Sequence, residues 1–206
     1  MSRPARIAVT GGVGSGKSTV VALLAERGSA IIDSDAIAHE LTAAGGVAID
    51  PIRKAFGAGV LDERGALDRG RMRMLVFSDP RQRLRLEAIL HPLIRERCLA
   101  LAREREANAP LLVFEIPLLA EAHVARRSLG LDRILVVDCP TSMQLARAGA
   151  RGAMTEEQVR AVIASQVPRW QRLAIADDVV CNVDSIDALR ARVARLWSSY
   201  CPGKSL

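Results

Sequence analysis

Residues 11–19 of the chain read Gly-Gly-Val-Gly-Ser-Gly-Lys-Ser-Thr, and residues 11–18 match the pattern G-x-x-x-x-G-K-S/T of a phosphate-binding loop. An apolar, strand-like run, Arg6–Thr10, comes directly before the loop, and a helical pattern opens at its end. Backbone N–H groups of such a glycine-rich turn surround a phosphate, and the helix N-terminus adds partial positive charge. The stretch therefore predicts a nucleotide site made by Gly11, Gly12, Val13, Gly14, Ser15, Gly16, Lys17, Ser18 and Thr19.

Two side chains of the loop indicate how a nucleotide would be held. Lys17 can reach the β- and γ-phosphates of ATP as a point charge, and the hydroxyl of Ser18 can ligate Mg²⁺. Lysine is scarce in this chain, because only Lys17, Lys54 and Lys204 among 29 basic residues are lysines. We therefore expect ATP as co-substrate, Mg²⁺ bound with the help of Ser18, and Lys17 as a catalytic residue.

Short apolar runs alternate with longer helical patterns along the chain. The runs are apolar at successive positions, as in strands that helices cover on both faces. Strands separated by helices predict right-handed crossovers and a parallel sheet. We therefore expect an α/β, three-layer P-loop fold with a five-stranded parallel sheet. The expected strands are Arg6–Thr10, Ala30–Asp33, Leu111–Glu115, Arg133–Asp138 and Asp178–Cys181.

The long segment between the second and third expected strands contains no convincing strand. It holds helical patterns instead, in which Asp68 and Asp79 stand where N-caps are expected. Residues 36–108 are therefore expected to form a helical insert that binds the acceptor of the phosphoryl group. Residues 142–168 are expected to form a short lid, and residues 1–206 together a single P-loop kinase domain.

The chain is basic, with 29 Lys and Arg against 23 Asp and Glu and a formal net charge of +6. Between Arg64 and Arg105 there are eleven arginines and five acids, so the excess in this segment equals the whole net charge. Three Phe, two Trp and one Tyr offer few rings on which nucleic-acid bases could stack. The charge therefore favours an acidic small molecule, steered to the insert, and argues against nucleic acid as a partner.

The four cysteines, Cys98, Cys139, Cys181 and Cys201, lie far apart and form no C-x-x-C pair. Three of them fall in apolar segments, so reduced core thiols are expected rather than a disulfide framework or a zinc site. The longest apolar stretch, Ala109–Ala120, is broken by a glutamate and a proline, so no membrane span is expected. These features predict a cytoplasmic protein, which we expect to be a monomer or a weak homo-oligomer.

Three of the expected strands end in an acid: Asp33, Glu115 and Asp138. Ligands of a parallel sheet bind beyond the carboxyl ends of its strands, so each acid is a site candidate, although each could instead cap a helix. Asp33 is favoured as a catalytic residue, because kinases of the nucleoside-monophosphate-kinase type hold the acceptor after the second strand. Its carboxylate can orient the acceptor hydroxyl and take its proton. Asp35 either helps to position this group or caps the following helix.

Further stretches stand in a fixed order from residue 7 to about residue 183. They are Thr10–Ser18, Ile32–Asp35 with Ile37–His39, His91–Ile94, Pro117–Leu119 with Glu121, and Ala176–Val180 with Asn182. In this order they resemble the dephospho-CoA kinase family. The resemblance implies a P-loop kinase that transfers the γ-phosphate of ATP to the 3′-hydroxyl of dephospho-coenzyme A, with Asp33 on the acceptor side.

Two pairs of residues gain expected roles in this context. His91 and Arg95 stand four residues apart and could hold a phosphate or the ribose of the acceptor, although His91 could simply cap a helix that begins at Pro92. Arg147 and Arg151 are expected to act catalytically, because a closing lid brings arginines to the charge of the transferred phosphoryl group. The alternative for this second pair is two solvated surface arginines.

The resemblance also assigns Pro117 and Leu118 to the substrate site. Asn182 follows the last expected strand, where adenine rests in such kinases, but a plain Asn turn is equally compatible with the sequence. Glu115 stands where aspartate is frequent in the family and apolar residues also occur, so it is given little catalytic weight.

The chain departs from the family at Val162, where many members carry an arginine. Any nucleotide contact of that arginine would be lost here, or supplied by Arg160 or Arg172.

Two other functions stay open from the sequence. One is phosphorylation of another small molecule or of a nucleoside monophosphate by the same fold. The other is a non-catalytic nucleotide switch or a nucleic-acid-dependent ATPase. GTPases are disfavoured, because the sequence contains no base-reading N-K-x-D tetrapeptide.

Overall fold

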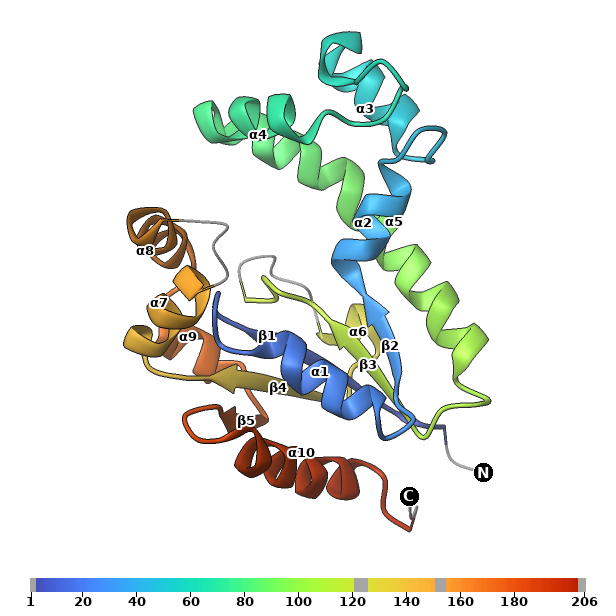
Figure 1. Cartoon of the computed structure of the whole chain (residues 1–206). Helices are drawn as coiled ribbons and strands as arrows, with labels where there is room; N and C mark the ends of the chain where they lie inside the picture. Colours follow the sequence, from blue (N-terminus) through green and yellow to red (C-terminus); the bar gives the residue numbers. More distant parts are fainter. Residues whose placement is uncertain (1–2, 121–125, 151–154, 204–206) are drawn as a thin grey trace. The chain divides into compact units, whose positions relative to one another are not determined.

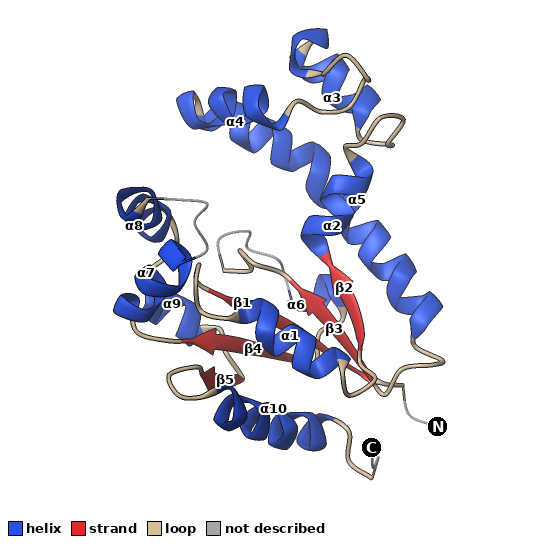
Figure 2. Cartoon of the chain, in the orientation of Figure 1, coloured by secondary structure: helices blue, strands red, loops and turns tan. Residues whose placement is uncertain are grey.

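The computed structural model describes residues 3–120, 126–150 and 155–203. Within them, a five-stranded sheet has the strand order β2-β3-β1-β4-β5 (Figures 1 and 2). All five expected strands are confirmed, and only the first differs, by one residue at each end. The strands are β1 Ala5–Gly11, β2 Ala30–Asp33, β3 Leu111–Glu115, β4 Arg133–Asp138 and β5 Asp178–Cys181.

The sheet is parallel, and β1 lies at its centre. β1 pairs with β3 on one side and with β4 on the other, and β4 pairs with β5, each in parallel register. The chain leaves β1 toward β2 but leaves β4 toward β5, so the strand order reverses between β1 and β4. Such a reversal opens a crevice beyond the carboxyl ends of the strands, where ligands of open α/β sheets bind.

Both faces of the central strands are buried, which explains their continuous apolar sequence. Ile7 and Val9 of β1 belong to a core to which helices α1 (Lys17–Ala25) and α10 (Ile186–Tyr200) also contribute side chains. Ala8, between these two residues, has no exposed surface either. The expectation of strands covered on both sides is therefore confirmed.

The chain divides into two compact units, Asp33–Leu101 and the remainder, Met1–Ile32 with Ala102–Leu206. Besides α1 and α10, the sheet-containing unit holds two short helices that the sequence did not suggest, α6 and α9. Its other helices are α6 Arg126–Leu129, α7 Thr141–Ala150, α8 Glu156–Ser165 and α9 Arg169–Ala174.

The other unit is helical and overlaps the expected insert 36–108. Both expected caps are confirmed, because Asp68 Oδ1 accepts a hydrogen bond from Arg71 N and Asp79 Oδ1 accepts one from Arg81 N. Its helices are α2 Ser34–Leu41, α3 Ile49–Phe56, the 3₁₀ turn η1 Ala58–Val60, α4 Arg69–Ser78 and α5 Pro80–Arg105, whose last residues belong to the sheet-containing unit.

The interpretation of His91 as a helix cap is wrong. Helix α5 begins at Pro80 and continues through Pro92, so His91 lies in its interior. Proline lacks the N–H that would bond to the carbonyl four residues earlier, but one missing bond does not end a helix whose apolar residues stay in phase. His91 and Arg95 are both exposed and stand one turn apart on this helix.

None of the helices in the described ranges combines the length and the apolar character that crossing a bilayer requires.

The four thiols differ strongly in accessibility. Cys98, Cys139 and Cys201 are buried, whereas Cys181 on β5 is exposed. Burial, with a contribution from the charge of Asp33, raises the pKa of the Cys98 thiol to about 11. Burial also raises the pKa of Cys139. A thiol must be both accessible and ionised to react, so these groups are protected in the folded chain.

We therefore expect one fast-reacting thiol per native chain when the protein is titrated with a colorimetric disulfide reagent at pH 8. Cys181→Ser should remove the fast phase, and full denaturation of the unsubstituted chain should expose all four thiols. A fast phase that survives in Cys181→Ser would contradict the burial of the other three.

Candidate active site

The phosphate loop connects β1 to α1 at the centre of the sheet. Gly14 and Gly16 have φ values of 71° and 91°, a region in which residues other than glycine are strained. Helix α1 begins directly after Gly16 with no side-chain cap and no acid in its first turn. Its first N–H groups are therefore free to bind an anion, whereas those of α2 and α8 are partly occupied by the capping side chains Asp33 and Thr155.

Side chains from three distant segments hold this loop. The Oε1 atom of Gln166, at the end of α8, accepts a hydrogen bond of 3.1 Å from Val13 N. Gln144 of α7 donates from Nε2 to the carbonyl of Val13 at 2.9 Å. Asn182, after β5, donates from Nδ2 to the carbonyl of Ser15 at 2.8 Å. Val13 is thus held from both sides by glutamines of the two helices in the expected lid region.

These contacts are so close that the loop has no room for side chains. A Cβ on Gly12 would lie 2.3 Å from Gln144 Nε2, and a Cβ on Gly16 would lie 2.1 Å from Asn182 Nδ2. A Cβ on Gly14 would lie 2.5 Å from the carbonyl oxygen of Gln144. The glycines therefore serve two purposes: they allow the backbone to turn, and they allow the surrounding elements to reach it.

Lys17 forms an ion pair with Glu115, the last residue of β3. Both side chains are largely shielded from water, with 16% and 14% of their surface exposed. Glu115 was given little catalytic weight from the sequence, yet it is the acid that contacts the ammonium group of the phosphate loop. An incoming phosphate must therefore compete with this carboxylate for Lys17.

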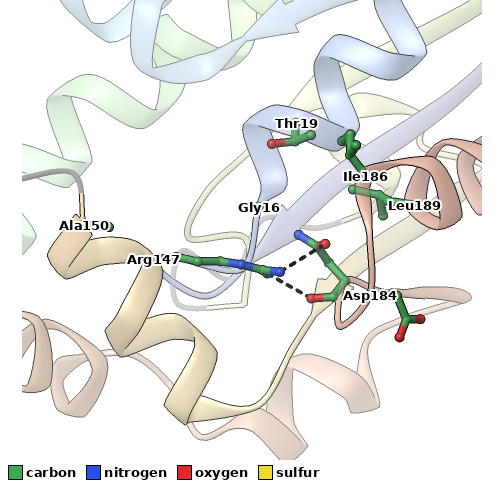
Figure 3. Close-up of a pocket in the computed structure, with 8 residues that line it drawn as sticks. Gly16, Thr19, Arg147, Ala150, Asp184, Ile186 and Leu189 are labelled. Carbon is green, nitrogen blue, oxygen red and sulfur yellow. Dashed lines mark hydrogen bonds between the residues drawn. The ribbon is translucent and has the colours of Figure 1, made fainter.

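A cavity of about 360 Å³ adjoins the loop (Figure 3). The guanidinium of Arg147 reaches into it from α7 and donates to the backbone oxygen of Asn182 at 2.9 Å and to its Oδ1 at 3.5 Å, the dashed lines in Figure 3. Asn182 is buried and is more than a plain turn residue, because it contacts both the loop and Arg147 of α7. The residues that line the cavity are Gly16, Thr19, Arg147, Ala150, Asn182, Asp184, Ile186 and Leu189.

Asp138, the third strand-end acid, holds an arginine of α9. Its carboxylate accepts hydrogen bonds from Arg169 Nε at 2.8 Å and from Arg169 Nη2 at 2.5 Å. The hydrogen bonds and the charge of Asp138 raise the pKa of Arg169. This two-point pair joins α9 to the end of β4, so Asp138 is already engaged within the protein.

Asp33 is the last residue of β2 and the N-cap of α2. Its Oδ1 atom accepts hydrogen bonds from Asp35 N at 2.8 Å and from Ala36 N at 3.1 Å. No hydrogen bond from the described residues reaches its second oxygen, Oδ2. Asp35 is not the cap of α2, because Asp33 is its N-cap. The side chain of Asp35 is exposed.

The remaining predicted residues are placed as follows. The carbonyl of Pro117 accepts a hydrogen bond of 3.0 Å from Thr10 Oγ1, which attaches the segment after β3 to β1. The side chain of Leu118 is 44% exposed, and Ser18 is exposed at the first turn of α1. Arg151 and Glu121 lie outside the described residues.

Sequence reasoning missed two residues of the site and only partly recognised a third. Gln144 had no local signal, because a single glutamine on an amphipathic helix is usually solvated, whereas here it is 4% exposed. Gln166 was given no role from the sequence, although its side chain contacts Val13 of the loop. Arg172 was one of two suggested replacements for a missing arginine, and it lies against Gly12, whereas Arg160 is exposed and pairs with Glu156.

Residues 5–188 match the sequence model of the dephospho-CoA kinase family. The chain belongs to this family. The dephospho-CoA kinase of Aromatoleum aromaticum is 50% identical over 194 residues, which cover 94% of this chain and 93% of that protein. The dephospho-CoA kinase of Ralstonia nicotianae is 48% identical over 201 residues, which cover 94% of this chain and 97% of that protein.

Solved structures agree with this membership. The dephospho-CoA kinase from Campylobacter jejuni superimposes with a TM-score of 0.70 at 26% identity, covering 96% of this chain and 98% of that one. A crystal structure from Thermus thermophilus reaches a TM-score of 0.79 at 35% identity, covering 95% and 97%. Shikimate kinase from Acinetobacter baumannii, at 17% identity and a TM-score of 0.52, shares the fold. The predicted P-loop kinase fold and the predicted family are confirmed.

The Lys17–Glu115 pair predicts an effect on nucleotide binding. Glu115→Gln removes the competing charge, so Lys17 should be available to the phosphates without first leaving a carboxylate. We expect ATP to bind about threefold more tightly in the presence of EDTA, which corresponds to roughly 0.7 kcal/mol. Isothermal titration calorimetry measures this change, with Lys17→Met as the control that loses affinity. Weaker ATP binding by Glu115→Gln under these conditions would contradict the competition.

Proposed function

We propose that this chain transfers the γ-phosphoryl group of ATP to the 3′-hydroxyl of dephospho-coenzyme A, giving coenzyme A and ADP. The observation that supports it best is the family match over residues 5–188. This range contains both the phosphate loop and Asp33, whose carboxylate stands at the end of β2. The kinase activity follows from the family, and the roles of the individual residues below are our assignments.

The phosphate loop and the cavity beside it form the nucleotide side of the site. The backbone N–H groups after Gly14 and the ammonium group of Lys17 would hold the phosphates. The cavity fits the adenine and ribose, because Ile186, 51% exposed, and Leu189 give it apolar surface next to the polar groups of Thr19 and Asn182.

Ser18 fits a role at the metal. Its hydroxyl is exposed one residue after Lys17 and is a hard oxygen ligand of the kind that Mg²⁺ prefers, alongside phosphate oxygens and water. Bound there, Mg²⁺ would offset the negative charge of the phosphates. No further protein ligand for the metal is assigned.

Asp33 would act on the acceptor. Its Oδ1 atom is fixed by the backbone of α2, so the carboxylate has a defined orientation, while Oδ2 is free of hydrogen bonds from described residues. An acceptor hydroxyl that donates to Oδ2 would be oriented for attack and would pass its proton to Asp33 as its oxygen bonds to the γ-phosphorus. The bond between the γ-phosphorus and the bridging oxygen breaks, and ADP leaves.

The other assigned residues divide between the two substrates. Arg147 lines the cavity, which supports a role on the nucleotide side, and Arg151 is assigned with it as a second lid arginine that stabilises the transferred group. The acceptor site is assigned to Asp35, His91, Arg95, Pro117 and Leu118, with the arginine-rich helical insert attracting the phosphates of the coenzyme. A cytoplasmic location, a monomeric or weakly associating state and the absence of a nucleic-acid partner stay predictions.

Asp33→Asn separates the chemistry from the helix cap. Asparagine caps a helix about as well as aspartate, so α2 and the stability of the chain should be preserved. The amide cannot take a proton, so we expect kcat for coenzyme A formation to fall by about 10²–10⁴-fold. The Kd for ATP should stay within severalfold, as measured by calorimetry.

Asp33→Ala is the companion variant. It removes both functions, so it should also lower the free energy of unfolding by about 1 kcal/mol, the typical cost of a lost N-cap. Asp33→Asn protein that is folded but no longer binds ATP would show that Asp33 does not act on the acceptor side.

The acceptor itself is tested with a panel. ADP formation should be stoichiometric with dephospho-CoA and at background level with AMP, dCMP, shikimate or gluconate. A faster reaction with another member of the panel would show that this other molecule, and not dephospho-CoA, is the preferred acceptor. ATP hydrolysis that requires DNA or RNA, with steep salt dependence, would favour the nucleic-acid-dependent ATPase.

A further inference from the structure

Arg172 of α9 is a buried cation directly beside the phosphate loop. Only 8% of its surface is exposed, and a Cβ built on Gly12 would lie 3.1 Å from its Nη2 atom and 3.4 Å from its Cζ atom. Gly12 is the second residue of the loop, and Gln144 approaches it together with Arg172. The guanidinium group is therefore packed against the loop backbone.

The charge of Arg172 has no acidic partner among the described residues. Its one hydrogen bond there runs from Nη1 to the carbonyl oxygen of Val167. The nearby carboxylate of Asp138 is occupied on both oxygens by Arg169, three residues earlier on the same helix. A buried charge is normally paired, because a poorly hydrated site without a counter-charge destabilises the charged form.

A second cation near the phosphate loop, Arg147, also lacks an acidic partner among the described residues. Arg147 donates to Asn182 through two neutral oxygens and forms no ion pair with a described residue. The other two basic groups of the site are neutralised, Lys17 by Glu115 and Arg169 by Asp138. The loop is thus surrounded by an excess of positive charge, of which Arg172 is the most deeply buried part.

We propose that the polyphosphate of the bound nucleotide is the missing counter-charge of Arg172. In this assignment, which rests on nucleotide binding at the loop in the proposed function, Arg172 acts on the phosphates through the low-dielectric space behind Gly12. Charges interact far more strongly there than in water.

The proposal predicts opposite effects on the empty and the loaded protein. Arg172→Met keeps much of the buried volume and removes the charge, so the melting temperature without nucleotide should stay the same or rise. The same variant should bind ATP at least tenfold more weakly. Since the attraction grows with ligand charge, the loss should be smaller for ADP and smallest for AMP.

Two further variants isolate the charge. Arg172→Lys keeps the charge with a different shape, so it should retain most of the ATP affinity that Arg172→Met loses. Arg160→Met is the matched control, because Arg160 is exposed and pairs with Glu156. It should change neither the melting temperature nor the Kd for any of the three nucleotides.

Calorimetric titration with ATP, ADP and AMP in the absence of acceptor, with thermal unfolding of the same samples, decides the matter. The proposal is overturned if Arg172→Met melts at a lower temperature and loses affinity equally for all three nucleotides, since Arg172 would then only support the loop. It is also overturned if ATP affinity is unchanged, or if Arg172→Lys is as defective as Arg172→Met. Failure of the unsubstituted chain to phosphorylate dephospho-CoA, with ATP binding intact, would instead count against the proposed function.

Discussion

Close contact between the backbone of the phosphate loop and the side chains around it is the constraint on which the rest of the site depends. Gly12, Gly14 and Gly16 leave no space for a Cβ, because Gln144 and Asn182 occupy that space. The register of the sheet contributes to the same packing, since Gly11 pairs with Val137 of β4, whose carbonyl would lie 2.6 Å from a Cβ at this position. The positions of β4, α7 and the segment after β5 therefore depend on the loop that they pack against (Figure 1). The conformation of the loop depends on these elements in turn.

This packing prepares the site for an anion before any ligand arrives. Hydrogen bonds from Gln144 and Asn182 fix the carbonyl groups of Val13 and Ser15 in the loop. Polar groups that are fixed in advance need little reorganisation when charge enters the site, which makes them effective in binding and in catalysis. The distribution of charge has the same effect, because two of the four basic side chains that the described residues place around the loop, Arg147 and Arg172, have no acidic partner among those residues.

Asp33 shows how one side chain can meet a structural requirement and still leave an oxygen atom available for the proposed chemistry. Strand ends and helix starts favour aspartate for local reasons, since its oxygen satisfies backbone N–H groups that the helix cannot. Here this requirement uses only one carboxylate oxygen and orients the other. The structural reading and the functional reading of a strand-end acid are therefore compatible, and the same holds for Asn182, which supports the loop and lines the cavity.

The sequence by itself determined the sheet and the loop, because both rest on local patterns. The strands are short runs that are apolar on both faces, the loop is a contiguous motif, and Asp33 and Asp68 are caps of the residues next to them. Only the tertiary structure decided which side chains surround the loop. Gln144 and Gln166 contact Val13 across 131 and 153 residues of chain, and nothing in their neighbourhood distinguishes them from solvated glutamines. Arg172 is buried, and Glu115 pairs with Lys17, because elements distant in the sequence pack together. No local sequence pattern predicts these contacts.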